Sequence, residues 1–114
     1  MINTSTSKTI NLQAKEQLKA EIACRAAAMK VKPVQIRVQR MTKKWASCSS
    51  KGRVSFSADL LLEPRTFQEY VIVHELLHLQ VPNHGKLFKS LMNAYLPGWE
   101  KILAERNGIA TRSL

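Results

Sequence analysis

One apolar stretch in the second half of the chain constrains the fold more than any other feature. Residues 71–79 read VIVHELLHL, so apolar side chains would cover most of the circumference of a helix formed there. Such a helix is expected to be buried, and its three polar residues would be costly to bury without partners. Thr66 and Glu69 stand three residues apart, as in a capping box, which predicts a helix from about Thr66 to Gln80.

The polar residues of this stretch form an H-E-x-x-H pattern. His74 and His78 are four residues apart, and a helix has about 3.6 residues per turn, so both imidazoles can reach one metal ion. Glu75 lies about 100° further around the axis, near enough to accept a proton from water activated by that metal. The pattern is typical of zinc sites in which the glutamate is the general base.

A third ligand is needed, because a catalytic zinc ion usually takes three protein ligands and leaves one position open. His84 is the expected ligand, since it follows the break at Pro82-Asn83 where the chain can turn back. Glu100 or Glu105 on a later helix is the alternative. We therefore expect one zinc ion per chain, held by all three histidines of the protein, with Glu75 as the catalytic base.

The rest of the chain predicts an α+β fold, because strand-like and helix-like patterns are segregated along it. Alternating apolar residues predict strands at 34–38 and 54–60, and turn residues predict a hairpin around Gly52. Segment 45–48 would complete a small three-stranded sheet. Further helices are expected at about 11–30, at 84–95 and from Pro97-Gly98 to about 107. The 114 residues are expected to form a single domain, with residues 1–9 flexible.

Basic residues dominate the middle of the chain. Lys and Arg total 18 against 8 Asp and Glu, a net charge of +10, and no acidic residue occurs between Glu21 and Asp59. The stretch 25–53 is therefore expected to attract nucleic acid, a nucleotide or acidic substrates. A solvated basic face that only aids solubility is the alternative interpretation.

The two cysteines indicate in which cellular compartment the protein is expected to work. Cys24 and Cys48 lie far apart, and the first residues lack the apolar stretch of a secretory signal. Two such cysteines are expected to be reduced thiols, which predicts a cytoplasmic location. No apolar run is long enough to span a bilayer, so no membrane association is expected. The sequence leaves the oligomeric state open.

Four segments in order resemble the YgjP-like metallopeptidase domain family. They are RMTKKWASCS at 40–49, GRVSF at 52–56, VIVHELLH at 71–78 and PNHGKLF at 82–88. The resemblance covers roughly residues 35–105, and it implies a zincin-like minimal catalytic domain that cleaves peptide bonds. It also implies the same metal ligands and the same base as the spacing does. Ala46 departs from the usual glycine of the family, and Ser57-Ala58 from its usual asparagine-tryptophan pair.

The substrate side is less constrained by the sequence. Arg40 and Lys43 could stabilise a polarised carbonyl or a phosphate, and Trp45 could stack on a ligand. The strand at 54–60, which contains Phe56, could bind an extended peptide through its edge. Each of these residues could equally be structural.

Two rival functions remain alongside a peptidase acting on peptides or proteins. Some members of the resembling family are described as nucleoside triphosphate pyrophosphohydrolases, and Arg40, Lys43 or Lys44 would then grip phosphates at the same metal site. A nucleic-acid-associated zinc protein is the third possibility. A closed four-ligand zinc site would favour it, and the absence of a cysteine near the histidines in the sequence counts against it.

Overall fold

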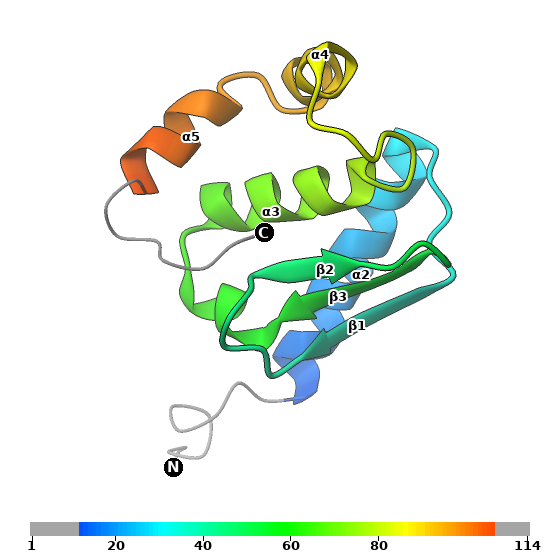
Figure 1. The fold of residues 1–114 in the computed structure, drawn as a ribbon. Coiled ribbons are helices and arrows are strands. Elements are labelled where there is room, and N and C mark those ends of the chain that lie inside the picture. Colours follow the sequence, from blue (N-terminus) through cyan, green and yellow to red (C-terminus); the bar gives the residue numbers. More distant parts are fainter. Residues whose placement is uncertain (1–11, 107–114) are drawn as a thin grey trace.

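A computed structural model describes residues 12–106, which form an α+β fold with a small three-stranded sheet, as predicted (Figure 1). The predicted flexible segment 1–9 lies outside the described residues. In chain order the elements are α2 (Leu12–Met29), β1 (Gln35–Gln39), β2 (Ala46–Cys48), β3 (Arg53–Ser57), the 3-10 helix η1 (Ala58–Leu62), α3 (Arg65–Leu77), α4 (Lys86–Tyr95) and α5 (Trp99–Arg106).

The sheet has the order β1-β3-β2, so β3 is its central strand. β2 and β3 are antiparallel and form the predicted hairpin, whereas β1 pairs with β3 in parallel. Gly52 turns the hairpin with a φ of +87°, and a Cβ atom there would lie 3.1 Å from the Cγ2 atom of Val34. Both observations explain a glycine at this position.

The predicted strand at 54–60 is wrong in two respects. It ends at Ser57, where the hydroxyl accepts a hydrogen bond from the Asp59 amide and caps η1. It is also paired on both sides, so it has no free edge for a peptide. The exposed edge of the sheet beside α3 belongs to β2 instead.

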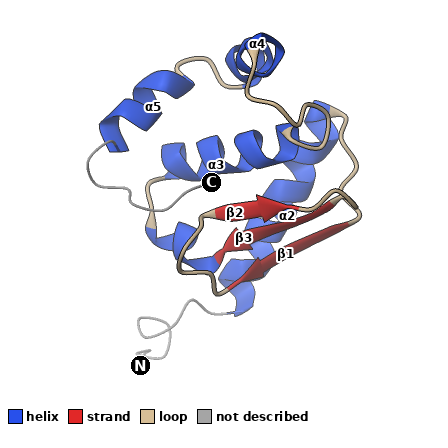
Figure 2. Cartoon of the chain, in the orientation of Figure 1, coloured by secondary structure: helices blue, strands red, loops and turns tan. Residues whose placement is uncertain are grey.

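Helix α3 lies at the centre of the molecule. The sheet and α2 lie on one side of α3, and α4 and α5 lie on the other (Figure 2). The elements in closest contact with α3 are α2, β2, α4 and α5. Tyr70 to Leu77 are all buried, which confirms the predicted buried helix. The core around it includes Leu18 and Ile22 of α2 and Val54 and Phe56 of β3.

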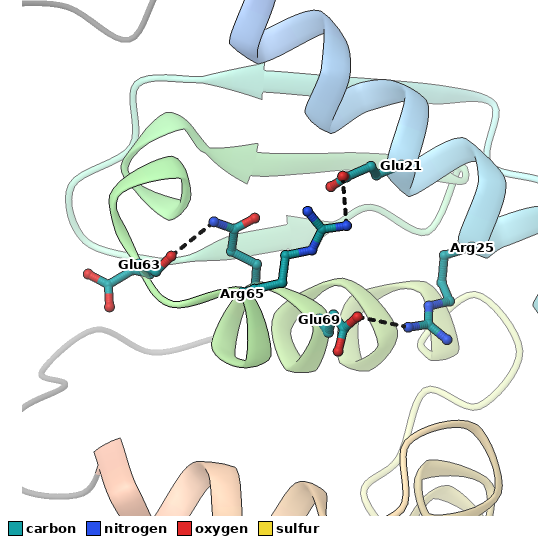
Figure 3. Close-up of polar contacts among 6 residues, drawn as sticks. Glu21, Arg25, Glu63, Arg65 and Glu69 are labelled. Atoms are coloured by element: carbon teal, nitrogen blue, oxygen red, sulfur yellow. Dashed lines mark hydrogen bonds and ion pairs between the residues drawn. The ribbon is translucent and has the colours of Figure 1, made fainter. Parts of the chain in front are cut away.

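The ends of α3 differ from the prediction. The helix begins at Arg65, directly after Pro64, and no side chain caps it. Thr66 lies inside the helix and is not its N-cap, so the predicted capping box does not form. The Glu69 carboxylate instead pairs with Arg25 of α2, Nη2 to Oε2 at 3.8 Å (Figure 3). The helix stops at Leu77 rather than Gln80.

Two ion pairs join α2 to the first turns of α3. Besides the pair formed by Arg25, Arg65 Nη2 lies 2.8 Å from Glu21 Oε2 (Figure 3). The Gln68 side chain donates a hydrogen bond to the Glu63 carbonyl just before the helix. These contacts fix the direction of α3 relative to α2 and so help to position its other end.

The chain after α3 is a loop up to Gly85, and α4 begins at Lys86 rather than at His84 as predicted. His84 therefore lies in a loop. Over residues 12–106, none of the helices has the length and apolar character needed to cross a membrane.

Candidate metal and catalytic site

The three histidines converge on one point at the end of α3. His74 comes from the helix body, His78 caps its C-terminus, and His84 comes from the loop before α4. His84 Nε2 lies 3.0 Å from His78 Nε2 and 3.2 Å from His74 Nε2. Within the described part of the chain, these three residues form the group able to hold a metal ion, and Glu100 and Glu105 lie outside it.

This geometry fits a metal ion. Nitrogens placed tetrahedrally about 2.0–2.1 Å from a zinc ion lie about 3.3 Å apart, close to the separations observed. His78 Nδ1 lies 3.2 Å from the Val81 carbonyl oxygen, which can only accept, so Nδ1 carries the proton. A neutral His78 then presents an unprotonated Nε2 to the other two rings, as a metal ligand must.

Phe88 of α4 supports the cluster from one side. Its ring centroid lies 5.2 Å from that of His74, 4.8 Å from that of His78 and 4.9 Å from that of His84. The Phe88 side chain is itself only 3% exposed. A buried ring packed against all three imidazoles restricts their rotation, so the ring nitrogens are held in position.

Burial sets the charge state of His74 and His78. It lowers the pKa of His74 to about 3, with smaller contributions from the neighbouring His78 and His84. It also lowers the pKa of His78, although the Val81 and Pro82 carbonyls oppose that effect. Both rings are therefore neutral at pH 7, the form in which imidazole binds a metal.

Glu75 has the properties of a general base. Burial raises its pKa to about 7, against a smaller lowering by the nearby Lys44. Its Oε2 atom is buried and has no hydrogen-bond partner among the described residues. A buried carboxylate oxygen without a partner is costly in free energy, and such groups often act on a ligand.

A cavity of about 400 Å³ opens beside Glu75 and His78. One wall is the edge strand β2, with Ala46, Ser47 and Cys48. Lys44 also lines this cavity. The cavity therefore brings together the edge strand, a lysine and the Glu75 carboxylate.

None of the four predicted substrate-binding residues lines this cavity. Trp45 and Phe56 are 5% and 0% exposed, so neither offers surface to a substrate, and both belong to the core. Trp45 packs edge-on against Phe67 of α3, with ring centroids 5.3 Å apart. Arg40 and Lys43 are exposed but do not line the cavity.

Phe88 is the site residue that the sequence analysis did not single out. One signal was available, since Phe88 follows His84 by four residues at the start of an amphipathic helix. Only the fold shows that the ring lies against the histidines rather than elsewhere in the core.

Residues 3–105 match the profile of one protein family, the YgjP-like metallopeptidase domain. The chain belongs to this family. The protein is therefore a metallopeptidase. Enzymes of this class use a metal ion, and the group of three histidines is suited to hold one. The expected substrate class is therefore a peptide or protein. No curated protein matches the sequence.

Two crystal structures share the fold of this YgjP-like domain. The metallopeptidase zymogen of Methanocaldococcus jannaschii jannalysin is 19% identical, with a TM-score of 0.66 over 78% of this chain and 95% of that chain. The metallopeptidase zymogen of Pyrococcus abyssi abylysin is 21% identical, with a TM-score of 0.67 over 87% of this chain and 97% of that chain. At these identities the likeness establishes a common fold.

Proposed function

We propose that His74, His78 and His84 hold one zinc ion per chain and that Glu75 is the general base in peptide-bond hydrolysis. The observation that carries the proposal is the convergence of three Nε2 atoms beside a buried carboxylate. Imidazole nitrogens are preferred ligands of zinc, and three of them leave one coordination position open.

The chain's own residues have distinct tasks in this mechanism. When bound, zinc supplies Lewis acidity to the substrate carbonyl and to water. Glu75 accepts a proton from the attacking water and later delivers it to the leaving amine nitrogen as the C–N bond breaks. Burial raises the pKa of Glu75, which favours its holding the proton of the water until the amine takes it.

The exposed edge of β2 is the proposed binding surface for the substrate backbone. β2 pairs only with β3 within the sheet, and it lines the cavity that contains Glu75 and His78. An extended peptide can add to such an edge through main-chain hydrogen bonds. This mode would hold the scissile bond next to the base without requiring a particular side chain.

The test compares the zinc-loaded wild type with Glu75→Gln on casein and on quenched fluorescent peptides. The variant should keep its zinc, because Glu75 is not a ligand, and lose about 10²–10⁴-fold in turnover. Glu69→Gln is the matched control, since Glu69 lies on the same helix but faces Arg25 of α2. A Glu75→Gln protein that cleaves as fast as the wild type would refute the assignment.

Hydrolysis of a phosphoanhydride is the second candidate, and Lys44 is the observation in its favour. Lys44 lines the cavity with Glu75 and is close enough to lower the pKa of that carboxyl, so it could contact a phosphate. Arg40 and Lys43, the other expected phosphate ligands, do not line the cavity. Pyrophosphate release from UTP by the wild type but not by Glu75→Gln would favour this activity.

A cytoplasmic location is also part of the proposal. Cys24 and Cys48 are both free thiols in the structure, which suits a reducing compartment. Recovery of the tagged protein in a periplasmic or secreted fraction would contradict it.

A further inference from the structure

A second cavity adjoins the one beside Glu75. It has a volume of about 720 Å³, and it shares Ser49, Ser50, His78 and Pro82 with the first cavity. The two cavities therefore lie next to each other, one beside Glu75 and the other beside the turn between β2 and β3. We call the two adjoining cavities together the basic groove.

The charge of the basic groove is strongly asymmetric. The second cavity is lined by Lys30, Lys32 and Lys51, the first by Lys44, and Glu75 is the one acidic residue lining either cavity. All four lysines are exposed. None of them takes part in an ion pair within residues 12–106, where the pairs involve Lys19, Arg25 and Arg65. The groove therefore has an uncompensated positive potential that attracts anionic groups.

Lys30 occupies a position that normally favours glycine. Its φ is +61°, in the left-handed region, and it directly follows the end of α2. The Val31 amide donates to the Ala26 carbonyl and the Lys30 amide to the Ala27 carbonyl, which is the hydrogen-bond pattern of a Schellman motif. A side chain here is strained relative to glycine. Replacing Lys30 with glycine is therefore expected to leave this helix end intact.

We propose that the basic groove binds acidic residues that flank the scissile bond of a peptide substrate, so that this metallopeptidase selects acidic segments. The proposal rests on the proposed function, because the groove begins at Glu75 and the edge of β2. A peptide added to that edge advances about 3.3 Å per residue, and its flanking side chains then continue into the cavity lined by the lysines.

The lining of the groove favours a peptide over a nucleic acid. No phenylalanine, tyrosine or tryptophan lines either of these two cavities. Single-stranded nucleic acid is generally bound by aromatic side chains on which the bases stack, together with basic residues. A groove that combines lysines with an open strand edge, and that lacks such rings, is better suited to an acidic peptide.

The test measures binding separately from hydrolysis. A fluorescent peptide with four glutamates on one side of a neutral core is compared, on zinc-loaded Glu75→Gln protein, with the same peptide carrying glutamines. A second pair of peptides has the block on the other side. One exposed ion pair is worth about two- to threefold in affinity, so three should give about tenfold tighter binding at low salt. The preference should shrink at high salt.

The decisive variant combines Lys30→Gly, Lys32→Gln and Lys51→Gln. It should lose most of the tenfold preference. Lys30→Gly should not lower the unfolding temperature, because glycine is the preferred residue at that position. The control variant combines Lys15→Gln, Lys89→Gln and Lys101→Gln, which removes the same charge from outside the groove and should keep the preference.

Each outcome decides the matter. Equal binding of the glutamate and glutamine peptides, or a preference that survives the groove variant, would overturn the inference. So would an oligothymidylate that binds more tightly than the acidic peptide and loses affinity in the groove variant. Wild-type cleavage of both peptides at equal rates would overturn the inference alone. Selective binding without any cleavage would contradict the proposed function alone.

Discussion

Replacing Glu75 with glutamine is expected to remove a loss of stability that the metal-free protein undergoes as pH rises, even though it also removes the proposed base. Burial raises the pKa of Glu75 from its ordinary value of 4.5 to about 7. The folded protein therefore holds this proton more tightly than the unfolded chain does. Between pH 4.5 and 7 the unfolded chain has lost this proton while the folded protein keeps it, so folding takes up one proton. The free energy of unfolding therefore falls as pH rises through this interval.

The size of the effect follows from that difference. One pH unit corresponds to 1.36 kcal/mol, so the interval from 4.5 to about 7 amounts to about 3 kcal/mol. The free energy of unfolding of Glu75→Gln, minus that of the wild type, should rise by about 3 kcal/mol between pH 4 and pH 8. The depressed pKa of His74 acts in the opposite direction, lowering stability as pH falls below 6.5, but it is common to both proteins and cancels.

Urea unfolding in excess chelator, followed by tryptophan fluorescence, measures this difference at several pH values. Trp45 is buried against α3, so its emission should report on the loss of the core. The buried glutamine amide adds an offset that does not depend on pH, so the change with pH is the quantity that matters. A difference between the two proteins that stays constant from pH 4 to pH 8 would refute the reasoning.

Two further predictions concern the support of the metal. His84→Ala should change the stability of the metal-free protein by no more than about 0.5 kcal/mol, because His84 is exposed, yet it should greatly weaken zinc binding in a chelator competition. Unchanged zinc affinity would exclude His84 as a ligand. Phe88→Ala should destabilise the protein by roughly 3–5 kcal/mol, since the ring is almost fully buried. Phe88→Leu should cost less stability but still lower zinc affinity about 10–100-fold, and wild-type affinity in that variant would limit Phe88 to a packing role.

The helices were predictable where the pattern was local. The apolar stretch at 71–79 indicates a buried helix by itself, and α3 is one. The prediction of a strand at 54–60 failed because Val54, Phe56, Ala58 and Leu60 are apolar at alternate positions, although the backbone becomes a 3-10 helix after Ser57. All four residues are buried, and so is Ser57 between them. The hydrophobic pattern alone therefore could not mark the end of the strand.

The order of the strands in the sheet could not be predicted from the sequence. The hairpin around Gly52 is a local feature, but the parallel pairing of β1 with β3 joins distant segments. That pairing makes β3 central and leaves β2 at the edge, which moves the proposed peptide-binding edge from 54–60 to Ala46–Cys48. Similarly, Glu69 was expected to cap α3, and its ion pair with Arg25 depends on how α2 packs.

The histidines were predictable because their spacing is local to one helix and the loop after it. The substrate side was not, since burial of Trp45 and Phe56 results from packing against α3 and within the sheet. Composition indicated a basic middle section. It could not indicate that Lys30 and Lys51 line one cavity, because that depends on the turn after α2 meeting the hairpin.

The central claim is that three imidazoles hold one zinc ion beside a carboxylate that does not bind it. X-ray absorption at the zinc edge, on protein loaded with one equivalent, tests this claim most directly. It should give one zinc per chain with three imidazole nitrogens and one further light donor at about 2.0–2.1 Å, and the spectrum should be unchanged in Glu75→Gln. A sulfur donor at about 2.3 Å, or a spectrum unaffected by His84→Ala, would contradict it.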